Sequence, residues 1–231
     1  MLFYAFYNTG LLELRPPNSP AESQFGYVGE VALLATGKDF HDTHRILTKM
    51  MERPGGVFDW SDNHNSKFEL SKLAPMDFAS KQTPNTPIII THPHSRAVTT
   101  VNPVKSYKFL GILLDPKLKW KAQTDCIVRS ADAWVNLIRR LDRTSRGISA
   151  IGMRLLYTTI AIPRLAYAAG VWYSPPHGTH NTGSRRSGMI SLTNKLESVQ
   201  RKATISILGA MRTTAGDILN AHAFLPHTFY Y

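Results

Sequence analysis

The spacing of the apolar residues in the 231-residue chain becomes predominantly helical beyond Trp120. Before this point, short runs rich in β-branched and aromatic residues are separated by turns that contain Gly, Pro and Asn, which is typical of β-hairpins. After it, apolar residues recur at three- and four-residue spacings, which is typical of amphipathic helices. The sequence therefore predicts an α+β fold in which small hairpins precede a bundle of helices.

Two hairpins are predicted in the first part of the chain. Residues 24–35, QFGYVGEVALLA, place two apolar runs on either side of Gly29 and Glu30, and a glycine at the first central position suits a tight turn. Residues 106–120, SYKFLGILLDPKLKW, give an extended run, then a turn at Asp115 and Pro116, and then a basic stretch. We expect a second hairpin there.

A helix and a loop are predicted between the two hairpins. Asp39 can cap a helix with apolar residues at helical spacing, and Pro54 with the two glycines that follow it should end this helix. Residues 82–103 are rich in Pro, Thr and Asn around the short apolar run 88–90. This composition predicts a loop with one strand, at a boundary between modules.

Three apolar stripes are predicted on helices after Trp120. The first consists of Trp134, Leu137, Ile138 and Leu141, and the second of Ile151, Leu155, Thr158 and Ile162, which Pro163 should kink or end. The third consists of Leu192, Leu196, Val199, Ala203 and Ile207, with Lys195, Arg201 and Lys202 off that face. We expect these stripes to form the core of an all-helical module.

The net charge of +11 is concentrated in the second part of the chain. Residues 1–104 contain 9 Lys and Arg against 10 Asp and Glu, whereas residues 105–231 contain 18 against 6 and therefore carry +12. Such a distribution indicates a surface that binds a polyanion, most commonly nucleic acid. A basic protein without such a partner remains an alternative.

The sequence gives no sign of secretion or of a membrane segment. Its lone Cys126 cannot form an internal disulfide, and the apolar start has no basic region of the kind that opens a signal peptide. The longest apolar stretch, residues 148–173, is interrupted by Arg154, Pro163 and Arg164. We expect an intracellular protein that is not secreted, and a nuclear location stays open.

Four segments in sequence order carry a family resemblance. They are YVGEVALLA (27–35), NSKFELSKLA (65–74), YKFLGILLD (107–115) and NKLESVQRKATISILGAMRTT (194–214). Together they resemble the C-terminal part of the reverse transcriptases of non-LTR (LINE-type) retrotransposons. The resemblance implies a residual palm subdomain at 1–104, a primer-grip-like hairpin at 105–122 and a basic, helical, thumb-like region at 123–231.

The chain departs from that family at the catalytic carboxylates. The family has two adjacent aspartates at the first hairpin, where this chain has Gly29 and Glu30, and its other catalytic aspartate belongs to a strand upstream of Met1. Nucleotidyl transfer needs two Mg²⁺ ions held by carboxylates. We therefore expect a fragment of an RNA-directed DNA polymerase without turnover, with Glu30 as a vestigial ligand and no productively bound Mg²⁺ or other cofactor. Restoring both aspartates should not rescue it.

The resemblance and the charge together indicate RNA or DNA as the partner, contacted mainly through phosphates, with no membrane and no small-molecule substrate. Lys72 matches a palm lysine, and Gly111 would allow close approach of the backbone. The other expected contacts are Lys105, Lys108, Lys117, Lys119, Arg139, Arg140, Arg201 and Lys202. Arg139 and Arg140, like Arg143 and Arg146, could instead favour the negative end of a helix.

Two other functional classes remain alternatives: a non-enzymatic basic helical module that binds nucleic acid or protein, and a decayed fragment with no stable function. The histidine pairs His41 and His44, and His92 and His94, have no third ligand at a suggestive spacing, so we expect them on the surface without a metal. The aromatic residues Trp134, Tyr157, Tyr167, Trp172 and Tyr173 could stack on bases, but most are expected in the core.

Overall fold

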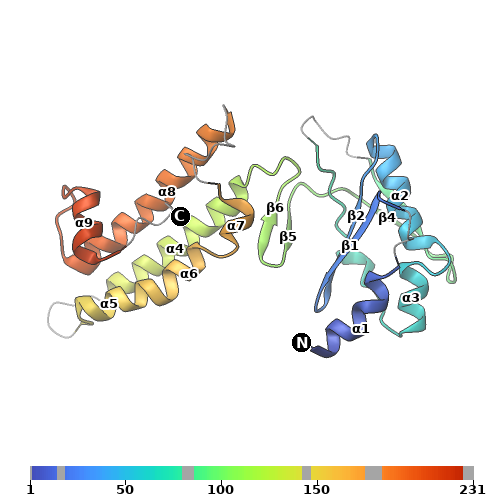
Figure 1. Cartoon of the computed structure of the whole chain (residues 1–231), viewed down its shortest axis with the longest axis horizontal. Coiled ribbons are helices and arrows are strands. Elements are labelled where there is room, and N and C mark those ends of the chain that lie inside the picture. The colour runs from blue at the N-terminus through green and yellow to red at the C-terminus, as the bar shows by residue number, and fades with distance from the viewer. Residues whose placement is uncertain (1, 15–18, 80–85, 142–146, 175–183, 226–231) are drawn as a thin grey trace. The chain divides into compact units, whose positions relative to one another are not determined.

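The computed structural model describes residues 2–14, 19–79, 86–141, 147–174 and 184–225, with the side chains of 2–6, 141 and 184–189 left aside. The chain forms two compact units, Met1–Leu118 and Lys119–Tyr231 (Figure 1). Helices and small antiparallel sheets make up the described elements, so the α+β class is confirmed. Arg143 and Arg146 lie outside the described residues.

The first unit combines helices with two-stranded sheets. Its helices are α1 (Leu2–Leu12), α2 (Phe40–Glu52), α3 (Val57–Asn63) and a 3-10 turn (Leu70–Lys72). Its strands pair consecutively and antiparallel: β1 (Glu22–Tyr27) with β2 (Glu30–Ala35), β3 (Ile88–Thr91) with β4 (Val98–Val101), and β5 (Tyr107–Phe109) with β6 (Ile112–Leu114). The core consists of Leu11, Met51, Val57, Phe58, Trp60, Ile88, Ile90 and Val101.

Helix α2 forms as the sequence predicts, because the Asp39 carboxylate accepts a hydrogen bond from the Asp42 amide at 2.7 Å and caps its first turn. Its inward face is more polar than predicted. His44 is buried and its Nε2 lies 2.7 Å from Asp77, so the expectation that this histidine lies on the surface is wrong. The acid partner follows 33 residues later, which helical spacing alone could not reveal.

The first hairpin is shifted by one residue from the predicted turn. Tyr27 and Glu30 form its last cross-strand pair, so the turn residues are Val28 and Gly29, and Glu30 begins β2. Val28 takes the positive φ of 54°, which is rare for a β-branched residue, and its carbonyl oxygen accepts a hydrogen bond from the Asn8 side chain at 2.5 Å. A contact from α1 thus holds a turn that local propensity would place elsewhere.

The second hairpin turns at Leu110 and Gly111, not at Asp115 and Pro116 as predicted. Both central residues have positive φ, 47° and 82°, which is the geometry of the type I′ turns that suit twisted strands. Residues 82–103 were predicted to contain one strand. They contain two, because Val98–Val101 pairs with Ile88–Thr91. The strand β4 was missed because its sequence, VTTV, is short and lies among turn-forming residues.

The second unit is helical in its described parts. It contains α4 (Lys121–Leu141), α5 (Ala150–Leu156), a π-helical turn (Tyr157–Ala161), α6 (Ile162–Leu165), α7 (Ala169–Trp172), α8 (Ser184–Leu208) and α9 (Gly216–Ala223). Lys195 pairs with Asp125 at 2.6 Å and Lys202 with Asp132 at 2.8 Å. From the first ion pair to the second, the residue number rises by seven on both helices. Helices α4 and α8 therefore run in the same direction (Figure 1).

The stripe predicted on α8 is confirmed, since Leu192, Leu196, Val199, Ala203 and Ile207 are all buried. The stripe predicted on α5 is wrong. Ile151 is 81% exposed and Leu155 60% exposed, whereas the buried residues are Met153, Tyr157, Ala161 and Leu165. Both faces of this segment are apolar, so its periodicity could not show which one packs.

The stripe predicted on α4 is confirmed only in part. Ile138 is buried as predicted, whereas Leu137 is 44% exposed, and the rest of the buried face consists of Ile127, Ala131 and Val135. Pro163, predicted to kink or end its helix, lies just after a π turn, and the helix ends two residues beyond it, at Leu165. Proline cannot donate a backbone hydrogen bond, and a π turn changes the hydrogen-bonding pattern of the helix at this place.

Within the described ranges, no helix has the length and apolar character needed to cross a membrane.

Replacing Leu196 by Ala should destabilise the protein by about 2–5 kcal/mol, because this completely buried side chain would leave a partial cavity between α8 and its neighbours. The matched control is Leu155→Ala on the exposed face of α5, which should change stability by less than about 0.5 kcal/mol. Urea denaturation measures both values. Equal losses in the two variants would contradict the assignment of these faces.

Candidate nucleic-acid interface

The turns of two hairpins meet on the first unit. The Glu30 carboxylate, at the first position of β2, accepts a hydrogen bond from the backbone amide of Leu110, at the tip of the β5–β6 hairpin, at 2.9 Å. The two residues are 80 positions apart in the sequence. We call this arrangement, residues 27–30 together with 107–114, the paired-hairpin site.

The paired-hairpin site offers little for metal chemistry. Of the two positions where the resemblance implies aspartates, Gly29 has no ligand atom and lies in open space, with no atom within 4 Å of where a side chain would begin. Glu30 has a carboxylate, and one of its oxygens is already held by Leu110. One carboxylate on an exposed turn cannot clamp two divalent ions.

A cavity of about 870 Å³ lies beside this site within the first unit. Most of the side chains that line it are apolar, among them Val31, Leu33, Phe109 and Leu114 from the two hairpins. Lys72 also lines it, but its ammonium pairs with Glu69, and this hydrogen bond raises the pKa of Lys72. The predicted palm lysine is therefore at the edge of a largely apolar hollow with its charge already paired.

Exposed lysines surround the second hairpin. Lys105, Lys108, Lys117 and Lys119 are all exposed, and Lys108 lies on β5 itself. For Lys105, Lys108 and Lys117, no acidic group in the described part of the chain comes within ion-pair distance. Their ammonium groups can therefore meet phosphates without breaking an internal pair. Gly111, which has no side chain, lies exposed at the tip of the hairpin.

The predicted contact residues of the second unit fall into two groups. Arg139 and Arg140 lie exposed in the last turn of α4, where the helix dipole favours a positive charge. Arg201 instead donates hydrogen bonds to the carbonyl oxygens of Arg212 and Thr214 at 2.7 and 2.6 Å, and Lys202 is paired with Asp132. Arg201 and Lys202 thus stabilise the unit, whereas Arg139 and Arg140 form no ion pair with the residues that the structure describes.

A similar pairing affects Asp125, since the hydrogen bond from Lys195 lowers the pKa of that carboxyl below its ordinary value. These ion pairs between α4 and α8 leave the net charge unchanged, because the net charge already counts both acids. They do engage the ammonium groups of Lys195 and Lys202 within the unit.

Of the five aromatic residues considered for base stacking, two are buried in the core, and Tyr173, like Trp134, is half-buried. Tyr157 and Trp172 are buried, and burial raises the pKa of Tyr157. Trp134 is half-buried beneath the guanidinium of Arg164, which lies 4.6 Å from the ring centre. Tyr167 is the exception, with 53% of its surface exposed.

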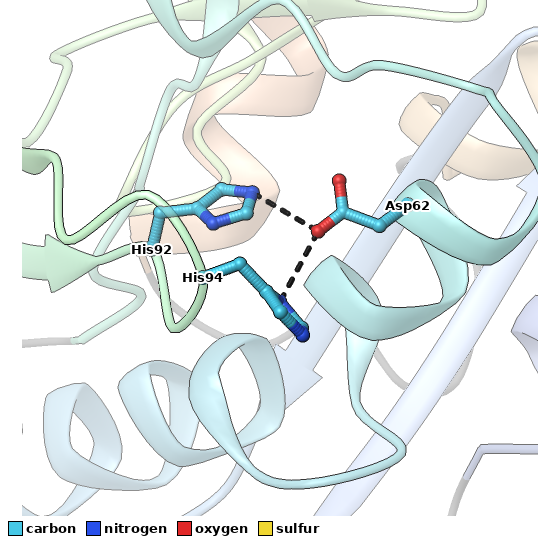
Figure 2. A group of neighbouring side chains, drawn as sticks. All are labelled: Asp62, His92 and His94. Carbon is cyan, nitrogen blue, oxygen red and sulfur yellow. Dashed lines mark ion pairs between the residues drawn. The ribbon is translucent and has the colours of Figure 1, made fainter.

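Sequence reasoning missed one cluster. His92 and His94 approach Asp62 of α3, which supplies the third potential ligand that no spacing suggested (Figure 2). The aspartate lies on a separate element 30 residues before His92, so only the folded chain brings the three together.

Comparisons of the chain with family models, curated proteins and solved structures find no match.

Replacing Gly111 by Ala should destabilise the protein by about 1–2 kcal/mol, since its φ of 82° is unfavourable for a residue with a side chain. Gly29→Ala is the matched control in the other hairpin turn. Its side chain would meet no atom within 4 Å, and its φ is not positive, so stability should be nearly unchanged. Thermal denaturation compares the two, and a loss in Gly29→Ala as large as in Gly111→Ala would rule out the assigned turns.

Proposed function

We propose that this chain is the palm-and-thumb part of a non-LTR retrotransposon reverse transcriptase that has lost catalysis and binds RNA or DNA through phosphates. The observation that carries the proposal is the contact between Glu30 and Leu110. It joins the two hairpins that the resemblance assigns to the metal-binding turn and to the primer grip. Segments with these two roles have to be neighbours, because a primer end must lie beside the catalytic metals.

The loss of catalysis follows from the chemistry of the paired-hairpin site. Two Mg²⁺ ions would be needed to activate the primer hydroxyl and to neutralise the triphosphate. Gly29 supplies no carboxylate, and Glu30 holds the tip of the other hairpin. The contact that keeps the hairpins together thus occupies the one carboxylate that the turn retains.

Phosphate contact is the mode of binding that the site supports best. Lys105, Lys108 and Lys117 are exposed cations at the second hairpin, and ammonium groups on flexible stems suit phosphate oxygens without selecting a base. Arg139 and Arg140 extend the same chemistry to the second unit. The proposed activity requires a compartment that contains nucleic acid, so we expect an intracellular location, with which the nucleus is compatible.

The first prediction of this proposal concerns salt. Binding of a fluorescent primer–template duplex should weaken steeply as salt rises, because each neutralised phosphate releases counterions, with a logarithmic slope of about 0.9 per contact. The variant with Lys105→Gln and Lys108→Gln should have a slope shallower by about 2. Fluorescence anisotropy across a salt series measures both slopes.

The control for this experiment is the variant with Lys195→Gln and Lys202→Gln, which removes the same number of charges from amines already paired with Asp125 and Asp132. Its slope should change by less than half as much. Affinity that does not vary with salt, or an equal change in both variants, would contradict phosphate binding at the second hairpin.

The second prediction is the absence of primer extension on RNA or DNA templates with either Mg²⁺ or Mn²⁺, because the turn holds a single, occupied carboxylate. A labelled primer resolved by gel electrophoresis gives the readout. Extension that disappears in Glu30→Ala would show that this residue still supports catalysis, and the proposed loss of activity would be wrong.

A further inference from the structure

Two imidazoles and a carboxylate converge on one point of the first unit (Figure 2). His92 Nε2 lies 3.7 Å and His94 Nδ1 3.2 Å from the same oxygen, Oδ2 of Asp62. All three potential ligand atoms lie within 4.8 Å of one another. Around a tetrahedral ion with bonds of about 2.1 Å, ligand atoms are separated by about 3.4 Å. The observed separations bracket that value for the two pairs that include Asp62.

From this geometry we infer a binding site for a divalent transition-metal ion of the zinc type, with Asp62, His92 and His94 as ligands. The inference does not depend on the proposed function, since the site uses neither hairpin of the paired-hairpin site. The ion would connect helix α3 to the turn between β3 and β4, two elements that the chain separates by a long segment.

The packing around the cluster orients two of the ligands before any ion arrives. Phe58 lies one helical turn before Asp62 on α3, and its ring centre is 4.5 Å from that of His92, whose side chain is 18% exposed. The His92 amide donates to Ala97 at 2.9 Å, and Arg96 closes the turn with a φ of 53° and a hydrogen bond to His92. A metal would therefore need to order chiefly His94, whose side chain is 65% exposed.

A second carboxylate completes the surroundings. Asp59 lies one turn before Asp62, with its Oδ1 3.7 Å from His94 Nδ1, while its Oδ2 accepts a hydrogen bond from the Gly55 amide at 2.7 Å. Because it faces the same nitrogen of His94 as Asp62 does, Asp59 is placed to act as a fourth ligand. Two carboxylates and two neutral imidazoles together carry a charge of −2, which matches a divalent cation.

The ligand types select the class of metal. Imidazole nitrogens suit zinc, cobalt, nickel and copper, whereas Mg²⁺ and Ca²⁺ prefer sites built from oxygen alone. Coordination through Nε2 of His92 moves the ring proton to Nδ1, which loses the hydrogen bond from Ser95. That bond is long, at 3.4 Å, so its loss opposes metal binding only weakly.

Titration of the full chain with Zn²⁺ alone, after removal of any purification tag, tests the inference. Calorimetry should show one tight site per chain, and Asp62→Asn and His94→Ala should each weaken it by more than about tenfold. Zn²⁺ should also raise the unfolding temperature of the wild type, since it binds only the folded arrangement, and this rise should be absent in both variants. Mg²⁺ in excess should not compete.

Two controls separate this cluster from other ligands. His41→Ala removes an exposed histidine of α2, and Cys126→Ser removes the exposed thiol, and both should leave Zn²⁺ affinity unchanged. Absence of Zn²⁺ binding by the wild type would overturn the inference. So would affinity that survives in Asp62→Asn and His94→Ala while circular dichroism shows that both variants are folded.

Discussion

The buried ion pair between Arg53 and Glu22 is the interaction on which the arrangement of the first unit depends. Arg53 follows the last turn of α2, and its guanidinium bonds to the Glu22 carboxylate at 2.7 Å and to the Leu14 carbonyl at 2.6 Å. The two side chains are only 13% and 7% exposed. Leaving either charge buried without its partner would destabilise the fold by several kcal/mol, so the start of β1 has to stay at the end of α2.

That constraint extends to the candidate site through the first hairpin. Once Glu22 is fixed, the register of β1 with β2 sets where the turn falls, and Asn8 of α1 holds the turn at Val28. Glu30 then begins β2 and can accept the hydrogen bond from Leu110. The proposed function therefore depends on a polar scaffold. Buried pairs position the hairpins, and Lys105, Lys108 and Lys117, which form no ion pair with the described residues, would contact the phosphates.

The local sequence pattern predicted the structure correctly where only one arrangement fitted it. It failed where contacts between distant residues determine the structure. The α8 stripe was predictable because only one face of that helix carries a continuous apolar row, and the cap at Asp39 because its bond is local. The buried face of α5 could not be predicted in this way, because both faces of that helix are apolar. Three other features depend on contacts between segments far apart in the sequence, which the spacing of apolar residues cannot predict. They are the position of Val28 in its turn, the acid partner of His44 and the approach of Asp62 to two histidines.

Hydrogen–deuterium exchange of the full chain, with and without a primer–template duplex at low salt, tests the central claim most directly. If the paired-hairpin site binds nucleic acid through its lysines, amides in residues 105–117 and around the turn at 27–30 should exchange more slowly with the duplex present, and physiological salt should remove much of this protection. Protection absent from both segments, or confined to the buried faces of α8 and α9, would contradict the account.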